Sequence, residues 1–140
     1  MNGVKYYNDS FSTTPETAMA AIRAFDSPEI LILGGSSKGS DFTELGQVIN
    51  QAKNIKAIIG IGVEWSTIKL RIMNSELRIK EGCQDMEEVV KAAYEMGKPG
   101  DVVILSPACA SFDMFKNYKH RGYEFKKAVG ALNTMLATTS

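Results

Sequence analysis

The chain has 140 residues, of which 44% are hydrophobic, and this is enough apolar material for one ordinary domain with its own core. Its 16 Lys and Arg residues balance its 16 Asp and Glu residues, so no basic excess points to a nucleic-acid partner. Because the sequence has no long apolar run, no secretory signal pattern and no metal-ligand spacing around Cys83, Cys109 and His120, we expect a cytoplasmic chain that binds neither a membrane nor a metal.

The first half of the chain alternates β-prone runs with helical patterns. Residues 4–8 are β-prone, and residues 15–25 repeat apolar side chains at helical spacing. Thr14 can cap this helix, and Pro15 is tolerated in its first turn. Residues 29–33 form an apolar run of the kind found in a strand that is covered on both faces.

The remainder of the chain repeats this alternation. The sequence predicts helices near residues 42–53, 64–74, 85–96 and 121–136, strands over residues 55–61, 77–80 and 102–105, and a disordered tail at residues 137–140. Strands that alternate with helices of this length indicate βαβ crossovers. We therefore predict a single α/β domain over residues 1–136, with a mostly parallel sheet and helices on both faces.

Three predicted loops follow strand ends, which is where parallel sheets bind ligands. They comprise residues 9–14, 34–41 and 106–118. In the second loop, Lys38 and free backbone N–H groups could hold a phosphate or carboxylate at a helix N-terminus, although a tight turn with a solvated lysine also fits. The loop is not the phosphate-binding pattern GxxxxGK[ST], and Gly60-Ile61-Gly62 lacks the third glycine of a dinucleotide site.

The other two loops also allow both a structural and a ligand-binding interpretation. Asp9 fits a turn that its own side chain stabilises, and it fits a carboxylate that holds a ribose hydroxyl. The small residues of 106–113 allow either close packing or the approach of a ligand to the backbone. Cys109 has no neighbouring base that would make it a nucleophile, and His120 has no evident acidic partner, so we interpret both as structural.

Three stretches of the sequence are distinctive when taken together and in order. They are YNDSFSTT at residues 7–14, GGSSKGSDF at residues 34–42 and LSPACASFDMFKNYKHRG at residues 105–122. Together they closely resemble the C-terminal domain of the Mur ligase family, in its D-glutamate-adding branch, the UDP-N-acetylmuramoyl-L-alanine:D-glutamate ligases. The resemblance covers nearly the whole chain, and its third stretch is peculiar to that branch. It implies a Rossmann-like fold and a place in peptidoglycan synthesis.

The resemblance also implies roles for particular residues. The D-glutamate-binding residues would be Thr13, Lys38, Ser111, Phe112 and Tyr118, while Asp9 would meet the ATP ribose when the domain closes on the central ATP-binding domain. ATP and Mg²⁺ serve the full-length ligase, whose UDP-binding and ATP-binding domains are absent from this chain. We therefore expect an isolated domain that is monomeric, binds D-glutamate, and has no catalytic residues, cofactor or activity of its own.

Some features of the sequence leave other interpretations open. The family commonly has lysine where Phe11 stands and asparagine where Thr14 stands, and it often has phenylalanine where Tyr118 stands. The main alternative is a free-standing α/β module that binds a small molecule or anion through Lys38. A phosphoacceptor signalling domain needs clustered strand-end aspartates, and Asp9 alone stands at such a place.

Overall fold

In the described part of the chain, five strands form one parallel sheet in the order β1-β5-β2-β3-β4. The computed structural model describes residues 3–8, 14–35, 41–73, 77–106, 115 and 117–139. The strands are β1 (Lys5–Asn8), β2 (Glu29–Gly34), β3 (Ile55–Ile61), β4 (Arg78–Lys80) and β5 (Val102–Leu105). Every pairing among them is parallel, so the predicted α/β class is confirmed and the sheet is wholly rather than mostly parallel.

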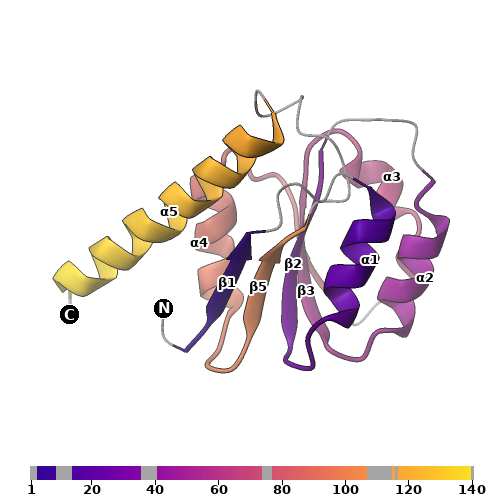
Figure 1. Ribbon diagram of the computed structural model, residues 1–140, viewed down its shortest axis with the longest axis horizontal. Coiled ribbons are helices and arrows are strands. Elements are labelled where there is room, and N and C mark those ends of the chain that lie inside the picture. The colour runs from indigo at the N-terminus through magenta and orange to yellow at the C-terminus, as the bar shows by residue number, and fades with distance from the viewer. Residues whose placement is uncertain are drawn as a thin grey trace.

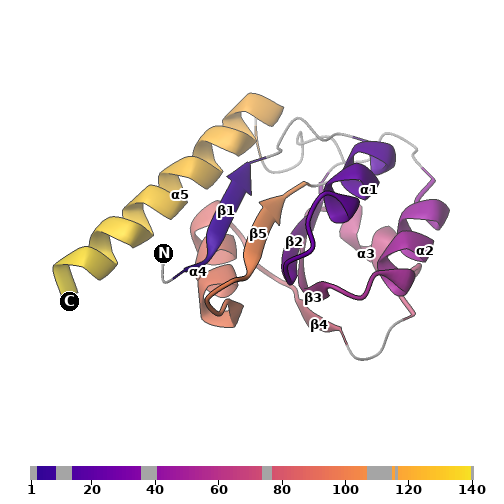
Figure 2. The ribbon, with the colours of Figure 1, turned by 60° about the horizontal axis from the view of Figure 1, so that its bottom comes forward.

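Helices cover both faces of this sheet, as predicted (Figures 1 and 2). They are α1 (Pro15–Arg23), α2 (Thr43–Gln51), α3 (Trp65–Lys69), α4 (Met86–Met96) and α5 (Tyr118–Thr139). One hydrophobic core lies between the sheet and α1, α2 and α3, and a second lies between the sheet and α4 and α5. The last turns of α5 project away from the sheet in both views.

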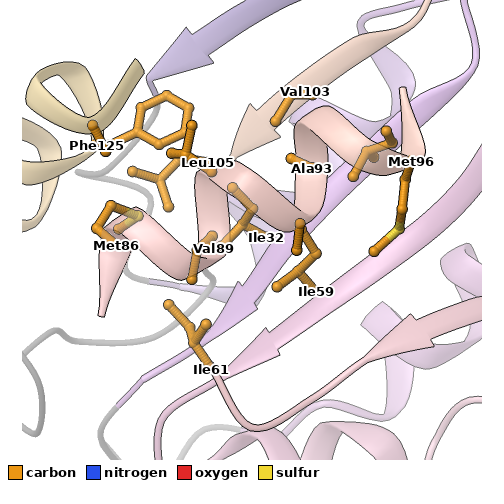
Figure 3. Close-up of a cluster of buried hydrophobic side chains, with 14 of the residues drawn as sticks. Ile32, Ile59, Ile61, Met86, Val89, Ala93, Met96, Val103, Leu105 and Phe125 are labelled. Atoms are coloured by element: carbon orange, nitrogen blue, oxygen red, sulfur yellow. The ribbon is translucent and has the colours of Figure 1, made fainter. Parts of the chain in front are cut away.

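Alternation along β2 explains why the central strands are apolar throughout. All six residues of β2 are buried. Ile30 and Ile32 belong to the core under α4 and α5, whereas Leu31 and Leu33 belong to the core under α1, α2 and α3. Figure 3 shows Ile32 beside Val89 of α4 in the first of these cores. A strand with helices on both faces has no solvent side on which polar residues would be favoured.

Helix α3 is shorter than the sequence pattern predicts. It ends at Lys69, although apolar residues continue at helical spacing toward residue 74. The side chain of Asn50 on α2 takes the backbone groups that a longer helix would use, because its Nδ2 donates to the carbonyl of Arg71 (3.1 Å) and its Oδ1 accepts from the N–H of Met73 (2.8 Å). This tertiary contact overrides the local propensity.

Helix α5 is longer than predicted at both ends. It begins at Tyr118 rather than near residue 121, because Asn117 caps it. At its other end it continues through Thr139, so residues 137–139 are helical where the sequence predicted a disordered tail. Among the described helices, none, including this 22-residue one, combines the length and the apolar character that crossing a membrane requires.

Candidate functional site

The carboxyl ends of three adjacent strands define the candidate site. Strand β5 lies between β1 and β2, and Leu105 is in register with Asn8 on one side and with Ile32 on the other. Helices α1 and α2, which follow β1 and β2 in the chain, cover one face of the sheet, whereas α5, which follows β5, covers the other face (Figure 1). Neighbouring parallel strands whose following helices lie on opposite faces mark the place where sheets of this class bind ligands. The three predicted loops therefore start from adjacent positions.

The predicted ligand-binding side chains lie outside the described part of the chain. This holds for Asp9, Thr13, Lys38, Ser111 and Phe112. Tyr118 is the first residue of α5, and its side chain also lies outside that part. Their roles stay predictions, and the described residues that flank them give the geometry of the site.

The loop after β2 leaves the sheet through a glycine that no other residue can replace without strain. Gly34 has φ of 119°, and a Cβ atom built on it would lie 1.9 Å from the carbonyl oxygen of Ile61. The carbonyl of Gly35 then accepts a hydrogen bond from the N–H of Glu64 at 2.8 Å. The first residues of the loop that carries Lys38 are thus held against the end of β3.

The same loop ends at a carboxylate that occupies the start of α2. Oδ1 of Asp41 accepts from the backbone N–H of Thr43 (2.9 Å) and from its hydroxyl (2.6 Å). These bonds, the one from the hydroxyl first, hold the pKa of Asp41 below its usual value. One N–H group at this helix terminus is therefore already satisfied by a negative charge.

The loop after β1 is fixed at both of its ends. At its start, Nδ2 of Asn8 donates to the carbonyl of Gly122 in α5 at 3.4 Å, which ties β1 to that helix. At its end, the hydroxyl of Thr14 accepts from the N–H of Thr17 at 3.4 Å and caps α1, as the sequence predicted. Residues 9–13 must therefore connect two well-defined points.

The described residues between β5 and α5 are Ser106, Phe115 and Asn117. Ser106 is buried at the end of β5, and Phe115 is buried in the core under α4 and α5. The ring of His120 meets the ring of Phe115 edge-on at 5.6 Å, and its Nε2 lies 3.4 Å from Oε1 of Glu124. The side chain of Arg121 is completely buried in the same turn. The sequence interpretation was therefore wrong in giving His120 no acidic partner, because Glu124, one turn further along α5, stands beside its ring.

Sequence reasoning missed Asn8, Gly34 and Asn117 as residues that shape the site. An asparagine before an apolar helical pattern is a capping signal, but the pattern after Asn117 becomes regular only near Arg121. The close approach of Gly34 to β3 cannot be deduced from the Gly34-Gly35 pair alone. Within the described residues, no group of three or more His, Cys, Asp or Glu side chains could hold a metal ion.

Comparison with known proteins adds information that the geometry does not carry. A family model described as "Mur ligase, glutamate ligase domain" matches residues 1–109. The UDP-N-acetylmuramoylalanine–D-glutamate ligase of Aquifex aeolicus is 47% identical over 131 residues, covering 91% of this chain and 30% of that protein. The ligase of the same name from Thermoanaerobacter sp. (strain X514) is 45% identical over 136 residues, covering 94% of this chain and 29% of that protein. The chain thus spans less than a third of the length of these relatives.

A solved structure has the same fold. The MurF ligase of Thermotoga maritima, crystallised in complex with ADP, matches with a TM-score of 0.52 over 90% of this chain and 28% of that one. The two sequences are 15% identical over the match. At this identity the likeness supports the α/β architecture alone.

Proposed function

Because the chain belongs to the Mur ligase glutamate ligase domain family, we propose that it is the C-terminal domain of a ligase that adds D-glutamate to UDP-N-acetylmuramoyl-L-alanine in peptidoglycan synthesis. The observation that carries the proposal is 47% identity, over 91% of the chain, to a relative with that name. The arrangement of the strands supports it, since the three loops that bear the family resemblance start from adjacent strands.

The proposed reaction has two steps, and this domain serves the second. In the full-length ligase, ATP phosphorylates the terminal carboxylate of the substrate. The amine of D-glutamate then attacks the acyl phosphate, and the tetrahedral intermediate expels phosphate to leave an amide. ATP and Mg²⁺ belong to the other domains in this proposal. The domain described here holds D-glutamate and closes on the central domain, which aligns the amine and excludes water.

We propose that D-glutamate is held by residues of all three loops. Lys38 pairs with a carboxylate of the ligand, while Thr13, Ser111, Tyr118 and the backbone of Phe112 complete its surroundings. A dicarboxylate needs a cation and several hydrogen-bond donors, because an unpaired charge is costly to remove from water. Asp9 would contact the ATP ribose on closure.

The first experiment is a two-dimensional amide NMR titration of the labelled chain with D-glutamate, L-glutamate and D-alanine, on the wild type and on Lys38→Ala. We expect shifts near Thr13, Lys38 and residues 111–118, a preference for D-glutamate, and loss of the response in the variant. Lys53→Ala is the matched control, because it removes an exposed lysine just before β3, where the strands begin and away from the candidate site. Silent loops up to tens of millimolar, the range of weak binding, would count against the assignment.

A further inference from the structure

The first turn of α5 depends on one side chain. Oδ1 of Asn117 accepts a hydrogen bond from the backbone N–H of His120 at 2.8 Å, and the carbonyl of Asn117 accepts from the N–H of Arg121 at 3.1 Å. This is an N-cap, in which a side-chain oxygen satisfies an N–H group that has no partner within the helix. Asn117 therefore determines that α5 begins at Tyr118.

The turns that follow are held in place by other contacts. Phe125 is buried in the core under α4 and α5, and its ring lies 6.5 Å from that of Tyr6 on β1. Asn8, at the carboxyl end of β1, donates to the carbonyl of Gly122. Loss of the cap at Asn117 would therefore loosen the first turn without detaching the rest of the helix.

We propose that Asn117 is a positioning residue for D-glutamate binding, which acts by fixing the start of α5 and with it the place of Tyr118. The inference rests on the proposed function, in which Tyr118 borders the ligand. Asn117 acts through the backbone of the helix, and no contact between it and the ligand is part of the proposal. Tyr118 is the terminal residue of the helix, so fraying of the first turn displaces it more than any residue further along.

The test compares four forms of the chain: wild type, Asn117→Ala, Asn117→Ser and Asp85→Ala. Serine also caps helices and is neutral, so it restores the cap without adding a negative charge near a dicarboxylate. Asp85 is the matched control because it caps α4 through a bond of 2.9 Å from the N–H of Glu88. The NMR titration gives the Kd for D-glutamate of each form, and urea unfolding gives its stability.

We expect Asn117→Ala to raise the Kd about fivefold, which at tenfold per 1.4 kcal/mol equals the typical cost of one lost cap. Asn117→Ser should restore most of the affinity. Asp85→Ala should lose comparable stability but keep the wild-type Kd. If Asn117→Ala and Asp85→Ala weaken D-glutamate binding equally, or if neither weakens it, the positioning role is overturned while the proposed function stands. A wild-type chain that shows no response to D-glutamate overturns the proposed function, and the positioning role with it.

Discussion

Glu29, the first residue of β2, carries a carboxyl group that the fold buries completely (0% exposed). Its Oε2 accepts a hydrogen bond from Nδ2 of Asn54 at 3.1 Å, whereas its Oε1 has no partner among the residues that the structure describes. Burial raises the pKa of Glu29 to about 8, and the bond from Asn54 lowers it only in part. At neutral pH the folded chain therefore holds a proton on this residue that the unfolded chain releases.

This proton makes a testable contribution to the pH dependence of stability. The contribution of protonated Glu29 to the free energy of unfolding is fully present below its unfolded pKa of about 4.5. It is lost as the pH rises toward about 8. The loss amounts to at most about 1.4 kcal/mol per pH unit. We expect Glu29→Gln, which cannot ionise, to gain stability relative to the wild type across this window, as measured by urea unfolding at several pH values.

The control for the Glu29 prediction is Glu44→Gln, which neutralises one exposed carboxyl group on α2. Its stability should change with pH as that of the wild type does. Parallel curves for Glu29→Gln and the wild type would contradict the prediction. The sequence gives no indication of this effect, because Glu29 precedes an apolar run just as an exposed strand terminus often does.

At the scale of elements, α3 shows how a very short helix is held in place by its surroundings. Five residues are too few for a helix to be stable alone. Its Trp65 lies directly against Gly60 of β3, and the indole N–H donates to Oε1 of Glu81 at 2.7 Å. Lys69 contacts the same oxygen at 2.7 Å. The helix is thus anchored to β3 and to the residue that follows β4.

This packing predicts a large effect from a small substitution. In Gly60→Ala the new methyl group would lie 2.1 Å from the nearest ring atom of Trp65, so the ring must move, and we expect a loss of about 1–3 kcal/mol. Urea unfolding followed by fluorescence measures it, since Trp65 is the only tryptophan of the sequence. Gly130→Ala is the control, because a Cβ atom there meets no atom of the described residues within 4 Å. A Gly60→Ala chain with wild-type stability and fluorescence would refute this account of α3.

The strands were the most predictable elements, and the helix ends were the least. A run such as that of β3 is apolar because both faces are covered, and this pattern is visible without knowing the neighbours. The end of α3 depends on Asn50, some 20 residues earlier in the chain, and the start of α5 depends on one hydrogen bond that Asn117 accepts from the N–H of His120. The location of the candidate site was predicted from the loops that follow strands in the sequence, whereas its side-chain roles came from family resemblance.

At the scale of the whole molecule, the amino ends and the carboxyl ends of the parallel strands differ in character. We call the side of the sheet where the strands begin its amino edge and the side where they end its carboxyl edge. At the amino edge, Asp101 is buried and its Oδ2 accepts from Nζ of Lys56 (2.6 Å) and from the N–H of Lys98 (2.9 Å). Glu29 and Asn54 lie at the same edge. At the carboxyl edge, the contacts of the described residues instead fix the points where the loops begin and end. Substitutions at the amino edge should therefore change stability more than binding.

The position of the candidate site at one edge of one domain predicts that the chain alone does not catalyse. The sequence has no GxxxxGK[ST] loop for ATP phosphates, and in the proposed function this domain supplies only the D-glutamate side of the site. Acyl phosphate formation needs a bound nucleotide and exclusion of water, which closure against a second domain would supply. Supplied with ATP, Mg²⁺, UDP-N-acetylmuramoyl-L-alanine and D-glutamate, the chain should release no phosphate above background. The full-length Aquifex aeolicus relative is the positive control in the same assay. Turnover by the chain alone would mean that it contains an activating site that neither its motifs nor its described residues reveal.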